Sequence, residues 1–228
     1  MDIRTYALPS QQSPPPQRPV EPLVQLECRY SHGVEGGGMS VGSGLLLDQR
    51  LVVTAAHLVA IERHRSTKSI AVRAHSSDGP VTLWVTGVSY PADWNRHDLA
   101  ILRLNRRLPE PSDAVHLARV HEGDEFDATL WGYPTRADWR AHRPETRSIR
   151  ARVQRGWLHY LSGRGVPGLS GGPLFYAGYA VGVHSGQRYV DRWVRSRQVA
   201  MPIVTDDLRV YMEKAHDVRH PRPAPRQG

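Results

Sequence analysis

The sequence predicts an all-β fold in two lobes, with a single helix near the C-terminal end. Short segments rich in Val, Leu, Tyr and Trp alternate with Gly, Pro, Asp and Asn, a pattern typical of strands joined by turns. Only residues 205–216 combine helix signals. Thr205 can cap the N-terminal end, Asp206 and Asp207 complement the helix dipole, and apolar residues follow at helical spacing.

The two lobes are expected within residues 23–216, which are enough for one large all-β domain. The first lobe should cover about residues 23–105 and the second, with the helix, about 123–216, with 106–122 crossing between them. The expected strands are 23–30, 44–47, 51–54, 70–75, 81–89 and 99–104 in the first lobe, then 128–133, 146–157, 172–176, 179–184 and 198–204 in the second.

The two ends of the chain differ from this domain in composition. Residues 1–22 contain six prolines and few large apolar side chains, and 217–228 are similar, so both are expected to be mobile or extended tails. The start lacks the charged, apolar and small-residue regions of a secretory signal, which favours a cytoplasmic location. The apolar runs are too short for a membrane-spanning helix, so we expect no membrane partner.

The composition is that of an ordinary globular protein, with 39% hydrophobic and 23% charged residues. The single cysteine, Cys28, cannot form an internal disulfide, so a buried core must hold the fold. The net charge of +8 comes almost wholly from arginine. Residues 136–155 hold seven arginines, which could neutralise nucleic-acid phosphates, but no nucleic-acid motif accompanies them and we favour a solvated hairpin. The seven are Arg136, Arg140, Arg143, Arg147, Arg150, Arg152 and Arg155.

Three short segments carry the residue types of nucleophilic catalysis. Ser170 lies in Gly-Leu-Ser-Gly-Gly-Pro, where flanking glycines allow a tight turn that exposes the hydroxyl and lets backbone N–H groups converge on an oxyanion. His57 ends the run Val-Val-Thr-Ala-Ala-His, and Asp98 precedes the apolar run at 99–104. Each segment alone is common in turns and strand ends. Their joint occurrence, in the order His, Asp, Ser, strengthens the case for nucleophilic catalysis.

These segments resemble the catalytic blocks of the trypsin-like (chymotrypsin-fold) serine peptidases, and most closely their disulfide-free bacterial branch of V8-like and glutamyl endopeptidases. The matching blocks are TAAH at 54–57, DLAILRL at 98–104 and GLSGGP at 168–173, supported by the stretches 42–47, 131–134 and 181–186. The resemblance spans roughly residues 23–215. It implies two antiparallel six-stranded barrels, with the catalytic residues at their interface and a C-terminal helix.

The resemblance also implies a mechanism, which is the serine-peptidase template mapped onto this chain. Ser170 would attack a peptide carbonyl, His57 would act as general base and then general acid, and Asp98 would orient His57. The backbone N–H groups of Gly168 and Ser170 would form the oxyanion hole. An acyl-enzyme would then be hydrolysed by water, and no metal or organic cofactor is required.

Two departures from the trypsin pattern bear on activation and specificity. Leu169 replaces the aspartate that pairs with a new N-terminal amine after zymogen cleavage, so that activation route is not expected. Arg164 lies near the place of the aspartate that selects basic residues, whereas His184 matches the histidine with which glutamyl endopeptidases bind acidic side chains. With Ser185 and Gly186 as neighbouring substrate-binding residues, Arg164 and His184 would favour an acidic P1 residue. Alternatively, the ring of His184 stabilises the barrel.

Two other functions were weighed. The Gly-x-Ser-x-Gly spacing around Ser170 also fits an α/β-hydrolase esterase, but that fold requires a helix after the serine and the order Ser, Asp, His. The arginine-rich segment would fit a basic binding module or an inactive peptidase homologue. We expect a protein or peptide as substrate. Because no zymogen switch is evident, control by a regulatory partner, as in bacterial stress or defence systems, or narrow specificity is also expected.

Overall fold

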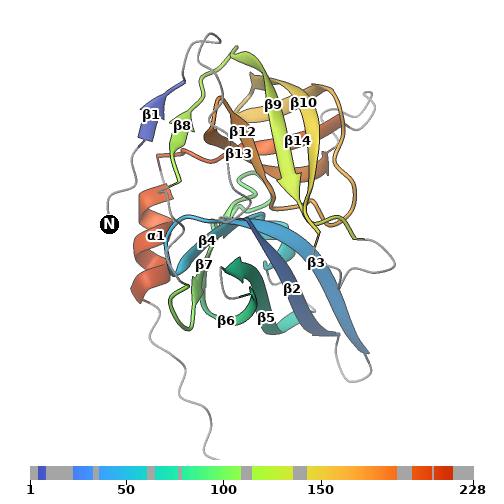
Figure 1. The fold of residues 1–228 in the computed structure, drawn as a ribbon, viewed down its shortest axis with the longest axis vertical. Coiled ribbons are helices and arrows are strands. Elements are labelled where there is room, and N and C mark those ends of the chain that lie inside the picture. The colour runs from blue at the N-terminus through green and yellow to red at the C-terminus, as the bar shows by residue number, and fades with distance from the viewer. Residues whose placement is uncertain are drawn as a thin grey trace, which may run out of the picture.

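A computed structural model of the chain shows two antiparallel six-stranded barrels stacked on one another, with one short helix against them (Figure 1). The all-β fold class, the two barrels and the C-terminal helix are therefore confirmed. The residues that the structure describes are 5–8, 23–32, 36–60, 65–76, 79–108, 115–135, 143–188, 197–206 and 208–217.

The first barrel closes in the order β2-β3-β4-β7-β6-β5. Short apolar runs form two of its strands, since all four residues of β4 are buried and β7 is buried at four of its five positions. Successive side chains point to opposite faces of a strand, so both faces of β4 and β7 are covered. Its strands are β2 (Leu23–His32), β3 (Gly36–Leu46), β4 (Leu51–Thr54), β5 (Arg65–Ser76), β6 (Gly79–Ser89) and β7 (Ala100–Leu104).

The second barrel closes in the order β13-β12-β9-β10-β11-β14, because β14 returns to pair with β13. Two further strands lie outside this ring on the edge of β13. Strand β8 (Leu117–Arg119) pairs parallel to β13, and β1 (Thr5–Ala7) pairs parallel to β8. The ring itself consists of β9 (Glu125–Gly132), β10 (Glu145–Gln154), β11 (Trp157–Ser162), β12 (Pro173–Tyr176), β13 (Tyr179–Arg188) and β14 (Arg197–Pro202).

The helix α1 (Leu208–Asp217) joins the two barrels. It follows β14 of the second barrel in sequence but packs on β6 and β7 of the first, where Leu208, Met212 and Ala215 are buried. Asp206 precedes the helix and pairs with Arg119 at 2.8 Å, while Asp207 lies outside the described residues. In the part of the chain that the structure describes, no helix has both the length and the apolar character needed to cross a membrane.

Besides β8, which lies in the segment 106–122 where no strand was expected, two local differences from the expected elements appear. The segment 146–157, expected as one strand, is divided between β10 and β11 by a tight turn at Arg155 and Gly156, whose φ angles are 53° and 75°. Consecutive positive φ angles match the twist of a hairpin, but Arg-Gly lacks the usual asparagine or aspartate signal. The second difference is that strand β1 lies within residues 1–22, where we expected a tail. Residues 9–22 and 218–228 lie outside the described part.

Candidate active site

His57 and Asp98 are joined by two hydrogen bonds at the edge of the first barrel. His57 lies in the 3-10 turn η1 (Ala56–Leu58), directly after β4, and Asp98 lies just before β7. The Nδ1 atom of His57 is 2.7 Å from Oδ2 of Asp98, and the His57 backbone N–H donates to Oδ1 at 2.8 Å. Because β4 and β7 pair side by side, their ends carry the two residues to the same place.

Asp98 is buried, with 2% of its surface exposed. Burial alone would raise the pKa of this carboxyl, but hydrogen bonds from His57 and Ser185, together with the nearby charge of His57, lower it below its usual value. The Ser185 hydroxyl, on β13 of the second barrel, donates to Oδ2 of Asp98. Asp98 therefore stays ionised, and the contact from Ser185 ties the two barrels together at this point. Sequence reasoning placed Ser185 only among substrate-binding residues and did not anticipate this contact.

Ser170 lies in a turn between β11 and β12 that is fixed against the first barrel. The Ser43 backbone N–H donates to the Ser170 carbonyl at 2.7 Å, and the Ser43 hydroxyl donates to the Gly168 carbonyl at 2.9 Å. Gly171 has a φ of 82°, and a Cβ added there would lie 2.1 Å from both the Ser43 carbonyl and Thr54 Oγ1. Glycine is therefore required at 171 by both conformation and space.

The N–H groups of this turn fall into two sets. Leu169 N–H donates to the Val166 carbonyl, and Gly172 N–H donates to that of Leu169. Gly171 N–H donates to the carbonyl of a β13 residue, His184, at 2.8 Å. By contrast, no hydrogen bond to another described residue engages the N–H groups of Gly168 and Ser170.

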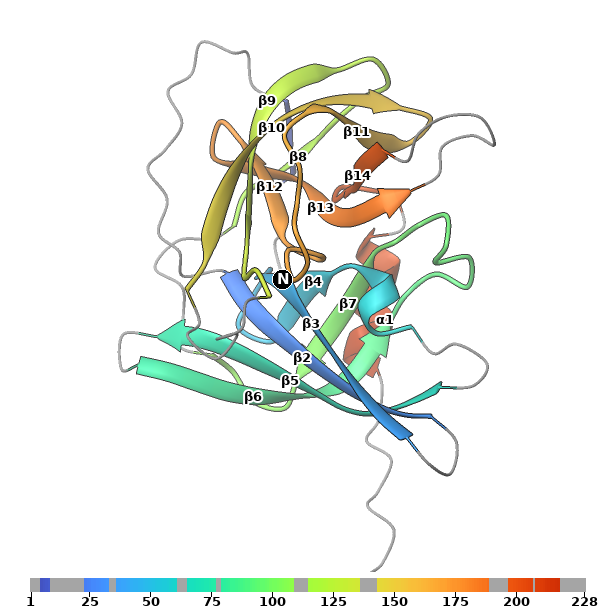
Figure 2. The ribbon, with the colours of Figure 1, turned by 90° about the vertical axis from the view of Figure 1, so that its right-hand side faces the viewer.

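The same part of β13 brings Ser170 close to the His57 and Asp98 pair. A Cβ added to Gly186 would lie 3.9 Å from Ser170 Oγ, and the preceding residue, Ser185, contacts Asp98. In Figure 2, β13 of the second barrel lies directly above the short coil of η1 in the first. The expected residues thus gather where the barrels meet, with Ser170 half-buried and His57 32% exposed at its side chain.

His184 and Arg164, by contrast, have very different environments. His184 is 2% exposed, its Nδ1 lies 2.8 Å from the Tyr160 hydroxyl, and a Cβ on Gly165 would lie 2.2 Å from its Nε2. Burial lowers the pKa of His184 to about 4, with a smaller effect from the charge of His57. The positive charge that the sequence analysis expected at His184 is therefore absent at neutral pH, and only the exposed Arg164 carries one.

The loop that carries Arg164 is held by a residue that sequence reasoning missed. The Gln198 side chain, on β14, accepts from Gly165 N–H and donates to the Gly165 carbonyl at 3.1 Å. Tyr160, on β11, was missed as well, although its ring stacks on that of His184 at 5.5 Å between centroids. No local motif marks either residue, because both contacts join strands that are distant in the sequence.

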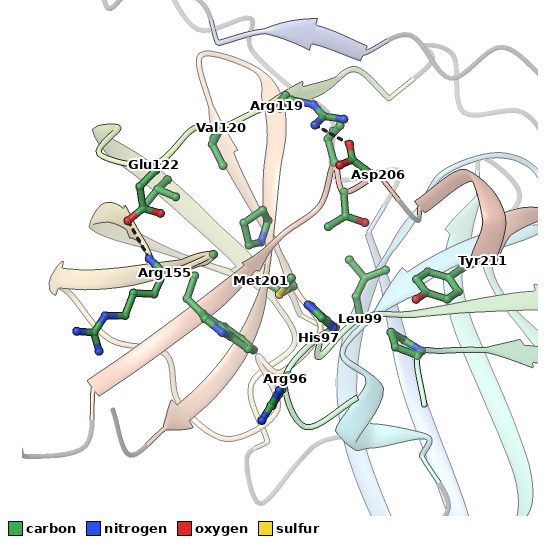
Figure 3. A pocket seen from close by; sticks show the side chains of 17 residues that line it. Arg96, His97, Leu99, Arg119, Val120, Glu122, Arg155, Met201, Asp206 and Tyr211 are labelled. Carbon is green, nitrogen blue, oxygen red and sulfur yellow. Dashed lines mark hydrogen bonds and ion pairs between the residues drawn. The ribbon is translucent and has the colours of Figure 1, made fainter. Parts of the chain in front are cut away.

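A cavity of about 370 Å³ is lined in part by the two sequence neighbours of Asp98 (Figure 3). Its wall includes His97 and Leu99, together with Tyr211 of α1 and Arg119 of β8. Both barrels and the helix thus border it. The acidic groups at its rim are already engaged, since Asp206 pairs with Arg119 and a Glu122 oxygen accepts from the Arg155 backbone N–H at 2.9 Å.

The arginine-rich segment is partly described. Arg150 and Arg152 alternate with buried residues on β10, and both bind Glu125 of β9, with Arg150 Nε 2.9 Å from the carboxylate. Arg147 lies 3.1 Å from Glu145. Arg150 and Arg152 face outward, whereas Arg147 is half-buried on the face that carries Ile149, and all three are matched by local carboxylates, as expected for a solvated hairpin. Arg136 and Arg140 lie outside the described residues.

Comparisons with known proteins agree with this architecture. A sequence model of the family described as "Trypsin-like peptidase domain" matches residues 42–183. The structure is similar to that of the Rv3671c protease from M. tuberculosis in its active form, with a TM-score of 0.62 and 21% identity over 96% of this chain and 92% of the other. It is also similar to the protease Anisep from Arthrobacter nicotinovorans, with a TM-score of 0.62 and 18% identity over 87% and 97%. No curated protein matches the chain in sequence.

The similarity to solved structures supports the fold, and the match to the family model shows which sequence family the chain belongs to. The matched region begins at Gly42, which precedes the histidine block, and ends at Val183, beyond the serine turn. It therefore includes His57, Asp98 and Ser170, and it covers more than half of the chain. The chain belongs to the trypsin-like peptidase domain family.

Proposed function

We propose that the protein is a serine endopeptidase in which Ser170 is the nucleophile, His57 the general base and Asp98 the residue that orients the base. The observation that carries this proposal is the buried Asp98 carboxylate, bonded to both the ring Nδ1 and the backbone N–H of His57. An ionised carboxylate at Nδ1 keeps the proton on that nitrogen. The lone pair of Nε2 is then left to accept a proton from a serine hydroxyl.

In the proposed reaction, Ser170 Oγ attacks the peptide carbonyl carbon while its proton passes to Nε2 of His57. The carbonyl oxygen gains the negative charge, and the unengaged N–H groups of Gly168 and Ser170 would stabilise it, each such donor being worth about 3 kcal/mol in well-studied enzymes. The imidazolium then gives its proton to the leaving amine. Water attacks the acyl-enzyme by the same route, which releases the acid and restores Ser170.

For specificity, we propose an acidic residue at P1. The exposed Arg164 would supply the positive charge. His184 is neutral and buried, with Nε2 facing Gly165, so it would support the loop that carries Arg164 rather than contact the carboxylate. Cleavage of a peptide library should then favour Glu and Asp. Arg164→Ala should weaken this preference, whereas Arg150→Ala, on the outward face of β10, should leave it unchanged. Equal or better cleavage after Lys, Arg or Phe would refute it.

We also propose that the enzyme acts on protein substrates in the cytoplasm under the control of a regulatory partner. The support is the apolar Leu169, which is fully buried and offers no carboxylate for activation by a new N-terminal amine. A partner, rather than cleavage of the chain, would then switch the activity. Adding lysate fractions to purified enzyme and following peptide hydrolysis tests this, and full activity of the enzyme alone on all substrates contradicts it.

The serine assignment is tested by labelling with a fluorophosphonate, which reacts only with activated serines. The parent should be labelled, Ser170→Ala should not, and Ser162→Ala, at an exposed serine outside the site, should be labelled like the parent. Labelling that survives Ser170→Ala would remove Ser170 as the nucleophile. No labelling of the parent, with or without partner fractions, would refute a serine mechanism.

A further inference from the structure

Strand β1 is an addition that the second barrel does not need in order to close. The ring of six strands is complete through the pairing of β13 with β14, and β8 lies outside it on the edge of β13. Without β1, the outer edge of β8 would present unpaired backbone groups. Such an edge is a ready acceptor for another extended segment.

The segment 5–8 pairs with this edge through its backbone and packs alternate side chains against the barrel. Its register with β8 is parallel, with Tyr6 opposite Ala118. Burial alternates along it, so that Thr5 and Ala7 are exposed whereas Tyr6 and Leu8 are half-buried. Main-chain pairing with alternate side chains in contact is the pattern by which strand-adding domains recognise peptides.

The contacts of the two inward side chains define what the site selects. The Tyr6 ring lies 5.2 Å, between centroids, from each of the rings of His116 and Tyr179, which themselves lie 5.9 Å apart. Leu8 packs against the core of the second barrel. One subsite is therefore aromatic, and the next, two residues along, is aliphatic.

We propose that the edge of β8 is a strand-docking site for an extended segment with an aromatic residue followed two positions later by an aliphatic one. The chain's own residues 5–8 occupy it. They are joined to β2 through residues 9–22, a connection of 14 residues. A connection of this length would hold the segment at a local concentration on the order of 1 mM. A free segment with the same pattern must then compete with the tethered one.

The site leads to the proposed catalytic residues. β8 pairs with β13 at Ala180, and Ala180 N–H donates to the His116 carbonyl at 2.9 Å. β13 continues to Ser185, which contacts Asp98. A partner that displaces residues 5–8 would act on the strand that carries Ser185. Through this link, the edge of β8 would be a docking point for the regulatory partner proposed above. This regulatory role rests on the proposed function, whereas the docking of a strand does not.

The test uses the full chain with Ser170→Ala, so that no cleavage can occur, and a fluorescent peptide of residues 1–12. Binding is measured by fluorescence anisotropy. With Tyr6→Ser and Leu8→Ser in the protein, the tethered segment should leave the site. The peptide should then bind at least tenfold more tightly than it binds the chain with its own segment intact, if the intrinsic Kd is about 100 µM or lower. The matched control, Thr5→Ser with Ala7→Ser, changes only the exposed side chains and should keep the weaker binding.

Three results would overturn the proposal. In the first, the peptide does not bind the Tyr6→Ser, Leu8→Ser chain at concentrations up to about 1 mM. In the second, it binds that chain and the control chain equally tightly. In the third, a peptide that carries Tyr6→Ser binds as tightly as the unchanged peptide. A parent chain that is dimeric by light scattering and becomes monomeric with Tyr6→Ser and Leu8→Ser would show that the segment docks on a second copy, and would overturn occupancy by the same chain. If the double variant is unstable, His116→Ala is used instead, and amide hydrogen exchange is measured at residues 117–119 of β8. Protection of these amides equal to that in the parent would count against the site. None of these readouts depends on peptidase activity.

Discussion

Burial of the His184 ring predicts that the fold loses stability between pH 6.5 and pH 4. In the unfolded chain, this histidine takes up a proton near its ordinary pKa of 6.5, whereas in the folded protein it does so only near pH 4. The unfolded state therefore binds more protons in this interval, and the free energy of unfolding falls as the pH is lowered through it. A difference of about 2.5 pH units corresponds to about 3 kcal/mol, a large fraction of the stability of a typical domain.

The assay is urea unfolding at pH 7, 5.5 and 4.5 in a Ser170→Ala background, which prevents self-cleavage. His184→Asn keeps a polar group beside Tyr160 but cannot titrate, so its stability should depend less on pH than the parent's. His121→Asn, at an exposed histidine, should show the parent's dependence. The lowered pKa of Asp98 affects stability only at still lower pH, below about 4, and does not disturb the comparison. Equal pH dependence in the parent and His184→Asn would refute the reasoning.

Three further substitutions have expected outcomes. Ser185→Ala removes a donor to the buried Asp98 carboxylate, so the free energy of unfolding in urea should fall by about 1 to 3 kcal/mol. For peptide hydrolysis, kcat should fall by a larger factor than KM changes. An unchanged kcat would argue against a role of Ser185 in positioning Asp98. Gly171→Ala forces a Cβ to within 2.1 Å of a carbonyl oxygen and should unfold at lower temperature than Gly156→Ala, which has a similar positive φ but open space; equal melting temperatures would contradict this. Leu102→Ala, in the core of the first barrel, should cost about 2 to 5 kcal/mol in urea, and a loss below 1 kcal/mol would mean that the core relaxes around it.

The sequence predicted most of the strands because their signal is local. Inward and outward side chains alternate along β9 and β10, and short apolar runs mark β4, which is fully buried, and β7, which is buried at four of its five positions. The boundary between β10 and β11 was missed because Arg155 adopts a positive φ that its residue type does not announce. Strand β1 was missed because its partner, β8, is more than one hundred residues away.

The same distinction separates the predicted from the missed parts of the site. His57, Asp98 and Ser170 each lie in a recognisable block, so their types and order were enough to select them as candidates. The contact of Ser185 with Asp98 and that of Tyr160 with His184 depend on how strands from separate parts of the chain approach one another. Burial of His184 also decides its charge, and burial is a property of the packed barrel rather than of the motif.

The lone cysteine gives this protein a built-in reporter of unfolding. Cys28 lies on β2 in the core of the first barrel, 1% exposed, and burial raises the pKa of its thiol to about 12. At pH 7, only about one thiol in 100,000 would then be the reactive thiolate, and that one is shielded from reagents. Disulfide reagents should therefore modify the chain only when the first barrel opens. The rate of modification would measure that opening directly, and cysteines introduced on the surface could carry labels without removal of the native one.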